Sequence, residues 1–337
     1  MNSPADPNRT NPTNPDPASL EPYPDPPLPP GHGRSGDPDR IFMGPNGLRA
    51  GWRICIWLCL SIAFIAISVL IVRKTPFLYR QVSGQASGPW SVIVGEGSVV
   101  WGVFVAALIM SAIEGRKPGV YGLPKNQAFK GYFWQGMLWG LVQVSLLVGL
   151  IAVAGGYSFG AIAQSNPDII KNGVLFLIGF LLVGFFEEFT FRGYSQFTLS
   201  TGIGFWPSAI ILSALFGAIH LGNPGEGAIG ALSVFVIGMF FCLTLRRTGN
   251  LWFAVGLHCS FDWGETFLYS VPNSGTTTAG ALSHSALHGP RWLTGGTVGP
   301  EGSVFCFLTM ILDFLVFLWL YRARPTLPAS PSDSVLP

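Results

Sequence analysis

Apolar residues form eight long runs that occupy most of this 337-residue chain. A run of about 20 apolar residues is long enough to cross a bilayer as a helix. The pattern therefore predicts an all-α polytopic membrane protein, a bundle of about eight transmembrane helices. The run 203–221 is short, and whether it spans the bilayer fully stays open. The eight runs cover, approximately, residues 51–72, 91–113, 131–155, 172–194, 203–221, 227–245, 250–270 and 302–321.

The two ends of the chain differ from these runs in composition. Residues 1–48 are dense in proline and contain six of the 17 acidic residues, as in "NPDPASLEPYPDPPLPPGHG". Such a segment cannot bury enough apolar surface to offset its chain entropy, and it lacks the apolar core of a signal peptide. We therefore expect a disordered segment over 1–48, a transmembrane helical domain over 49–322 and a disordered tail over 323–337.

Lysine and arginine predict the orientation, because cytoplasmic loops are enriched in both. If the N-terminus is cytoplasmic, the loops on that side hold nine of these residues and the opposite loops hold five. The distribution favours cytoplasmic N- and C-termini. The net charge of +2 is spread over the loops, so we expect no nucleic acid partner. The lack of eukaryotic targeting signals favours the plasma (inner) membrane of a bacterium.

Ionisable residues stand inside three of the runs, although a charge at the bilayer centre costs roughly 2.5–3.5 kcal/mol. The run 172–194 ends in "EEFTFRGY". Glu188 and Arg192 are four residues apart, so they share one helix face and can pair. Glu187 leaves the helix about 100° away from Glu188 and points elsewhere.

The other two runs carry histidines. "FGAIH", from Phe216 to His220, ends one apolar run, and "HCSFD", from His258 to Asp262, lies inside another. His258 and Asp262 are again four residues apart and on one face. Together the three segments supply carboxylates and imidazoles that can activate water or hold a metal.

Structural interpretations compete with this one. Glu188 and Arg192 can form a buried ion pair whose role is purely structural. A histidine at a helix end, such as His220, is more often a satisfied polar residue than a catalyst. Asp262 can serve only to orient His258, as carboxylates often do.

The segments "EEFTFR", "FGAIH" and "HCSFD" resemble the three motifs of the CPBP family, the CAAX protease and bacteriocin-processing enzymes, also called Abi proteins. Those motifs are Glu-Glu-x-x-x-Arg, Phe-x-x-x-His and His-x-x-x-Asn/Asp on successive membrane helices. The resemblance covers roughly residues 172–268, and the stretches 116–124 and 294–302 look similar to relatives as well. The last motif ends in aspartate, where the eukaryotic CAAX prenyl endopeptidases have asparagine.

The resemblance implies an intramembrane peptidase, a CAAX prenyl endopeptidase-like hydrolase with its cavity open toward the cytoplasm. It implies that Glu187 and His220 activate the attacking water. His258 and Asp262 would stabilise the oxyanion or position the substrate carbonyl. Because a negatively charged carboxylate is a poor oxyanion donor, we expect Asp262 to be protonated or to hold His258 in a donating state.

Supporting roles follow from the same resemblance. Glu188 is a candidate for a second catalytic carboxylate, and Arg192 and Phe216 would support the site structurally. Whether a metal takes part stays open. Glu187, His220 and His258 would make a three-ligand zinc site with a fourth position for water. A Glu/His pair can equally activate water without a metal.

A non-catalytic function is the alternative: a membrane transporter, or an adaptor with a buried ion-pair network. Buried ionisable residues also mark ion and substrate pathways. Against a transporter, the chain shows no broken helices in repeated halves. For the enzyme we expect the lipid bilayer and a peptide or protein substrate at the membrane as partners, although no residue identifies that substrate.

Overall fold

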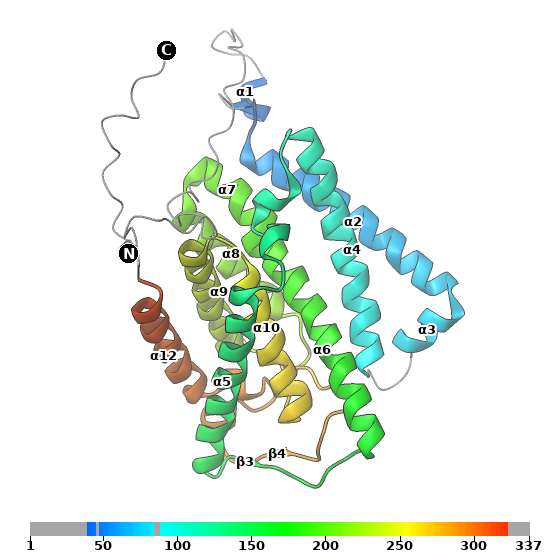
Figure 1. Ribbon diagram of the computed structural model, residues 1–337, viewed down its shortest axis with the longest axis vertical. Helices are drawn as coiled ribbons and strands as arrows, with labels where there is room; N and C mark the ends of the chain where they lie inside the picture. The colour runs from blue at the N-terminus through cyan, green and yellow to red at the C-terminus, as the bar shows by residue number, and fades with distance from the viewer. Residues whose placement is uncertain (1–38, 45–46, 84–87, 323–337) are drawn as a thin grey trace, which may run out of the picture.

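The computed structural model describes residues 39–44, 47–83 and 88–322, and this part of the chain is largely helical (Figure 1). The α-helices are α1 (Asp39–Phe42), α2 (Ala50–Lys74), α3 (Pro76–Val82), α4 (Pro89–Ile113), α5 (Gly131–Val153), α6 (Asn166–Glu188), α7 (Ser195–Ile203), α8 (Phe205–His220), α9 (Ala228–Thr248), α10 (Trp252–Trp263), α11 (Arg291–Thr294) and α12 (Val304–Leu320). Short 3-10 turns are η2 (Pro118–Tyr121), η3 (Lys125–Gln127) and η6 (Pro300–Gly302), and π-helical segments are η4 (Phe189–Tyr194) and η5 (Gly264–Leu268).

Five helical stretches of the described residues are long and apolar enough to cross a membrane: α2, α4, α5, α9 and the stretch Asn166–Ile203. The chain is therefore an integral membrane protein. Each of the eight predicted runs contains a helix, but α8, α10 and α12 have 16, 12 and 17 residues. These are shorter than the roughly 20 residues that a perpendicular crossing needs. The predicted count of eight spans is thus confirmed for five stretches only.

The helix predicted over 172–194 is longer and less regular than expected. α6 begins at Asn166, with Ser165 before it and Pro167 in its first turn, as is typical of helix starts. Beyond Glu188 the chain continues as the π-helical η4 and then as α7. Gly193 departs from helical geometry inside η4, with ψ of −111°. This kink cannot be inferred from hydrophobicity, because the apolar pattern runs through it.

Two pairs of very short antiparallel strands accompany the helices. β1 (Met43–Gly44) pairs with β2 (Gly47–Leu48), and β3 (Tyr157–Ser158) pairs with β4 (Ala286–Leu287). α1, β1 and β2 lie inside the segment 1–48 that the composition predicts to be disordered. The rest of 1–48 and the predicted tail beyond residue 322 lie outside the described residues.

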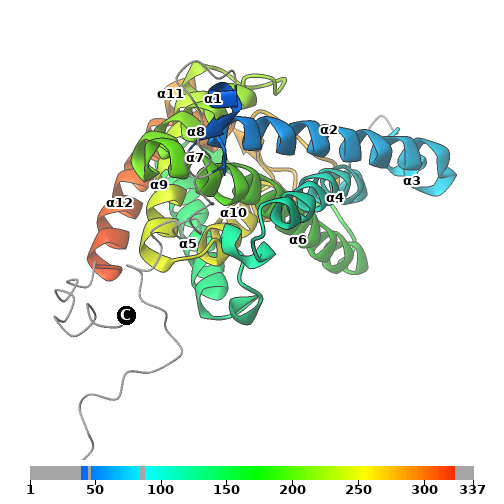
Figure 2. The ribbon, with the colours of Figure 1, turned by 90° about the horizontal axis from the view of Figure 1, so that it is seen from above.

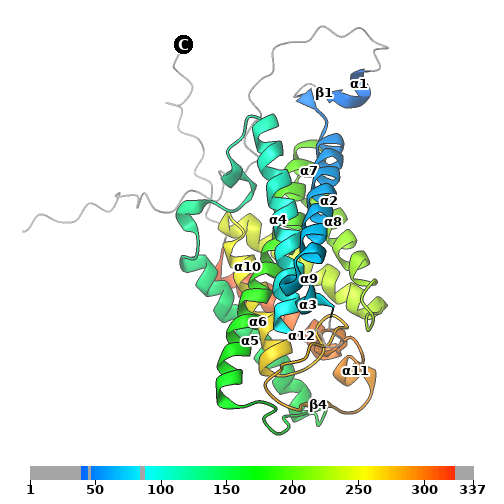
Figure 3. The same ribbon diagram turned by 90° about the vertical axis from the view of Figure 1, so that its right-hand side faces the viewer.

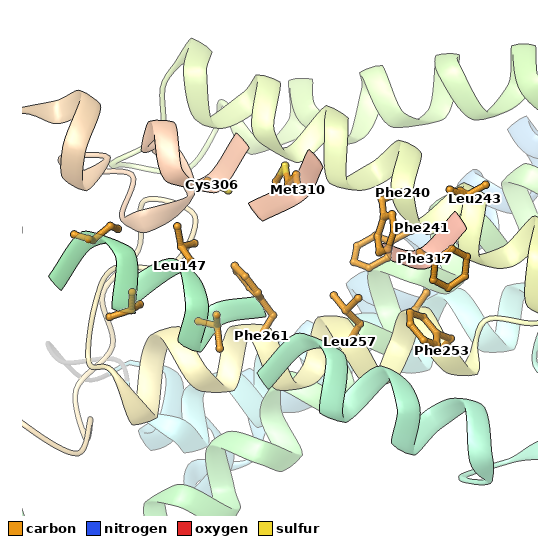
Figure 4. Packing of buried hydrophobic residues seen from close by; sticks show 14 residues of the cluster. Leu147, Phe240, Phe241, Leu243, Phe253, Leu257, Phe261, Cys306, Met310 and Phe317 are labelled. Atoms are coloured by element: carbon orange, nitrogen blue, oxygen red, sulfur yellow. The ribbon is translucent and has the colours of Figure 1, made fainter. Parts of the chain in front are cut away.

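The main core joins α5, α9, α10 and α12. Phe253 and Leu257 of α10 lie toward the aromatic side chains of α9 and α12, and Phe261 belongs to the same cluster nearer Leu147 of α5 (Figure 4). On its other side α10 packs so closely on α5 that a Cβ atom at Gly256 would lie 2.2 Å from the Phe133 carbonyl oxygen. Small residues allow such close backbone approach between membrane helices. α10 is therefore held rigidly in the interior, although it is short.

A second packing unit fixes the start of α7. α2 and α4 lie side by side, and α2 extends with α3 away from the rest of the bundle (Figure 2). Glu114, at the end of α4, forms an ion pair with Arg53 of α2 and accepts hydrogen bonds from Tyr121 at 3.1 Å and Tyr194 at 2.7 Å. Because Tyr194 ends η4, this cluster anchors the kinked segment that follows Glu188.

The segment from η5 to α12 covers one end of the bundle. Figure 3 shows β4 and α11 at the end opposite α1 and α7. The backbone of this segment hydrogen-bonds to the loop between α8 and α9, with Gly225 N donating to Gly275 O at 3.0 Å. The ends of α8 and α10 are thereby connected through their loops.

Candidate active site

The three predicted motifs meet at one cavity. A cavity of about 270 Å³ is lined by Glu187 of α6, His220 of α8, and His258 and Asp262 of α10. These residues are far apart in sequence, and the packing of α10 on α6 and of α8 on α9 brings them together. Phenylalanine and aliphatic side chains form much of the remaining wall. Electrostatic interactions are stronger in such an environment than in water.

The imidazole of His258 lies between two adjacent carboxylates. Its Nδ1 atom is 3.0 Å from Glu188 Oε1, and its Nε2 atom is 3.4 Å from Glu187 Oε2. The two glutamates leave the helix in different directions, yet both reach the same ring. From helical spacing we expected Glu187 to point away from Glu188, and this expectation did not include a shared partner. The spacing of residues along α6 cannot show that the ring of His258, on another helix, lies between the two side chains.

Asp262 adds a third carboxylate to the same histidine. Its Oδ2 atom is 3.5 Å from His258 Nε2, which is the predicted pairing over four residues. The His258 ring stacks on Phe241 of α9, with ring centres 5.4 Å apart and planes 15° apart. The imidazole is therefore restrained both along its edges, by carboxylates, and on one face.

Glu188 and Arg192 form the predicted ion pair, and both side chains are fully buried. Arg192 Nη1 is 3.4 Å from Glu188 Oε1, the oxygen that also contacts His258. The guanidinium carbon of Arg192 lies 4.2 Å from the centre of the Phe216 ring, a cation–π contact. Phe216 thus contacts Arg192 directly, so the two residues predicted to support the site lie side by side.

His220 stands on the cavity wall at the C-terminal end of α8. Its Nδ1 atom donates a hydrogen bond to the Phe216 carbonyl oxygen at 2.8 Å, and its ring packs edge-on against Phe216. A neutral imidazole that donates through Nδ1 keeps a lone pair on Nε2. His220 can therefore accept a proton or a hydrogen bond at Nε2.

In the part of the chain that it describes, the structure gives no grouping of side chains that supports the predicted zinc ligands. Among the described residues, no three or more histidine, cysteine, aspartate or glutamate side chains are grouped so that they could hold a metal ion. Glu187 and His258 approach each other, and the hydrogen bond from His220 Nδ1 to the Phe216 carbonyl leaves the Nε2 atom of His220 available. The zinc site of Glu187, His220 and His258 stays a prediction, and we derive no step through a metal.

Sequence reasoning missed other polar residues of the cavity. Glu301 of η6 and Asn273, after η5, both line it. Glu301 Oε2 accepts hydrogen bonds from the backbone N and the Oγ of Ser274, at 2.6 and 3.0 Å. Glu301 lies in the stretch 294–302, whose similarity to relatives could have pointed to it. Asn273 lies in no motif, so the sequence contains no comparable signal for it. Glu96 of α4, a residue without a motif, is also on the wall.

Comparison with known proteins supports the motif assignment. Residues 169–264 match the family model described as type II CAAX prenyl endopeptidase Rce1-like. Lysostaphin resistance protein A from two strains of Staphylococcus epidermidis is 25% identical over 179 residues, which are 50% of this chain and 45% of each relative. The chain thus spans about half the length of the curated relatives it matches. No solved structure matches this chain.

The matched region begins in the first turn of α6 and ends just after α10, so it contains all three motifs and the cavity residues Glu187, His220, His258 and Asp262. The resemblance to the CAAX prenyl endopeptidases is therefore confirmed over the part of the chain that builds the candidate active site.

Proposed function

We propose that this protein is an intramembrane endopeptidase of a bacterial plasma membrane, which hydrolyses peptide bonds near the cytoplasmic surface with water activated by Glu187 and His220. One observation carries the proposal: carboxylates and imidazoles from three separate motifs line a single cavity. Amide hydrolysis needs a base, an acid for the leaving amine and donors for the oxyanion. The residues of this cavity supply each of these groups.

Glu187 is the proposed general base. Its side chain is 18% exposed, whereas that of Glu188 is fully buried, so Glu187 is the carboxylate that water can reach. It takes one proton from the water while the oxygen attacks the carbonyl carbon and an electron pair moves to the carbonyl oxygen. When the C–N bond breaks, the same proton passes to the leaving nitrogen. His220 Nε2 accepts a hydrogen bond from the second O–H of the water and so orients the molecule.

His258 is the proposed electrophilic group. Carboxylate oxygens lie near both ring nitrogens of His258. Only the doubly protonated imidazole can donate a hydrogen bond from each nitrogen. Such a ring places positive charge beside the developing oxyanion. The buried pair of Glu188 and Arg192 holds the ring from behind through Nδ1, which fixes the direction of Nε2.

The substrate is proposed to be a small peptide or a protein tail at the membrane. The family name refers to the cleavage of CAAX prenyl proteins, and the curated relatives are named for resistance to lysostaphin. Processing of, or immunity toward, a small peptide fits a bacterial membrane better than cleavage of a prenylated tail. A zinc ion is the untested alternative for water activation.

The test is cleavage of fluorogenic peptides by the protein purified in detergent, with and without a chelator. The panel contains prenylated tails, unmodified tails and leader peptides. Glu187→Gln keeps the size of the side chain and removes the base, so we expect its kcat to fall about 10²–10⁴-fold. Activity that survives the chelator supports the metal-free route, and loss that added zinc restores supports the metal.

The matched control is Asp313→Asn. Asp313 is a buried carboxylate of α12 that accepts a hydrogen bond from Trp139 at 2.8 Å and does not line the cavity. An asparagine retains the acceptor, so activity should stay close to wild type. The transporter or adaptor alternative would be favoured if the wild-type protein cleaved no peptide of the panel but bound these peptides as tightly as Glu187→Gln does.

A further inference from the structure

The three motifs supply one donor for the oxyanion, His258, and leave a second donor to be identified. The last motif position is Asp262, and a carboxylate accepts hydrogen bonds where an oxyanion needs them donated. Asp262 is already 3.5 Å from His258 Nε2, which ties it to the histidine. A preorganised second donor near the oxyanion typically contributes about 10²–10³ in kcat. Another side chain of the cavity would have to provide it.

Asn273 has the required properties. It lines the same cavity as Glu187, His220 and His258, and it is 9% exposed. Within the described residues, its Nδ2 atom has no hydrogen-bond partner. The Asn273 side chain also approaches the Asp262 carboxylate closely enough to act on it as a hydrogen-bond donor, at a longer or less direct geometry than a regular hydrogen bond. A buried amide without a partner is costly, so it is expected to have a role that supplies one.

The backbone around Asn273 is held firmly. Asn273 N donates to Thr276 O at 2.9 Å, and Thr276 N donates back to Asn273 O at 2.8 Å. Ser274 has a positive φ of 43° and donates twice to Glu301. Asn223, three residues after His220, donates through Nδ2 to Ser274 O at 2.8 Å. These bonds connect the turn to the end of α8 and to η6, so the Asn273 amide is preorganised.

We propose that Asn273 is a further catalytic residue, which donates a hydrogen bond from Nδ2 to the carbonyl oxygen of the scissile peptide bond as that oxygen becomes negative. This inference rests on the proposed peptidase function. As water adds to the carbonyl carbon, the C=O electron pair moves to the oxygen and Asn273 Nδ2 stabilises it. The proton of the water goes to Glu187 and later to the leaving amine, while Asn273 keeps its own protons throughout.

The test compares Asn273→Ala and the nearly isosteric Asn273→Asp with wild type on any peptide that wild type cleaves. A donor used only in the transition state lowers kcat and leaves KM unchanged. We expect kcat to fall about 10²–10³-fold in both variants. Peptide affinity, measured in the Glu187→Gln background, should not change. A kcat within twofold of wild type in either variant would overturn the proposal.

A second-site change distinguishes chemistry from structure. Asp262→Asn places an amide donor beside the same oxyanion, so the double variant Asn273→Ala/Asp262→Asn should regain at least about tenfold in kcat. Ser274→Ala removes a hydroxyl from the same turn and keeps the amide, so its kcat should fall much less. Asn273 would only support the turn if Ser274→Ala and Asn273→Ala lowered kcat equally, both lowered Tm, and Asp262→Asn did not restore kcat. Wild-type protein that cleaves no peptide would refute the proposed function itself, and this inference with it.

Discussion

The Nδ1 atom of His258 lies 3.0 Å from the Oε1 atom of Glu188. The same oxygen is 3.4 Å from Arg192 Nη1, so a single carboxylate oxygen joins the histidine of one motif to the arginine of another. Both partners of the ion pair are fully buried. Removing one member of a buried ion pair costs roughly 3–5 kcal/mol, because the other charge is left without compensation. Glu188 therefore affects stability and the orientation of His258 together.

Glu188→Gln should lower both Tm and kcat. The amide retains a contact to His258 but leaves the Arg192 charge uncompensated in the interior. We expect a loss of unfolding free energy on the order of 3 kcal/mol and a kcat lowered about tenfold or more. Thermal melting in detergent and peptide cleavage measure the two effects. An unchanged Tm would mean that the pair contributes nothing to the fold.

Gly238→Ala tests the space reserved for Arg192. A Cβ atom at Gly238 of α9 would lie 2.4 Å from Arg192 Nη2 and 3.1 Å from Ser213 Cβ. The guanidinium would have to leave its place near Phe216, and its pairing with Glu188 would weaken. We expect an overpacking cost of about 1–3 kcal/mol and reduced cleavage.

Gly149→Ala in α5 is the matched control for that change, because nothing lies within 4 Å of the Cβ atom it would add. It should leave Tm and cleavage unaltered. If the two variants behaved alike, the observed effect would come from helix propensity and not from crowding of Arg192.

We expect Glu301 to make the free energy of unfolding depend on pH. Burial raises the pKa of the Glu301 carboxyl above its usual range, and the two hydrogen bonds from Ser274 oppose that effect. A folded-state pKa above the unfolded value means that the folded protein binds the proton more tightly. The stabilisation is then complete below the unfolded pKa and is lost as pH rises through the folded pKa.

The corresponding measurement is Tm against pH for wild type and Glu301→Gln, between about pH 5 and pH 8. The glutamine does not titrate, so wild type should lose stability relative to it as pH rises. Parallel curves for the two proteins would show that Glu301 does not titrate in this range. The opposite slope would show that the anion is the form favoured by folding.

Membrane orientation can be tested at Thr297. This exposed residue belongs to the segment that covers the end of the bundle opposite α1, near the cavity residues Asn273 and Glu301. In a variant without the five native cysteines, Thr297→Cys should react with an impermeant maleimide added outside intact cells, if the N-terminus is cytoplasmic as predicted. Labelling only after lysis would reverse the orientation. External labelling would also show that the loop wall of the cavity faces away from the cytoplasm, so a cytoplasmic cleavage site would require entry from the other end.

Much of the chemistry of the site could be predicted from the sequence, because its motifs follow helical spacing. The pairings of Glu188 with Arg192 and of His258 with Asp262 both join residues four apart on one helix, and both are present. Contacts between helices were not predictable in the same way. The approach of His258 to Glu187 and Glu188 depends on how α10 packs against α6, which residue spacing does not encode.

By itself, the amino-acid sequence determined that the protein is apolar enough to enter a membrane, where its helices lie and which ionisable residues stand inside them. Hydrophobic burial and local hydrogen bonding act over short stretches of chain, so composition and periodicity report them directly. The tertiary structure alone decided that the helix after Glu188 is kinked at Gly193, that Phe216 lies against Arg192, and that Asn273 and Glu301 reach the cavity from a loop. Those features depend on side-chain packing between segments distant in sequence, and no local pattern records it.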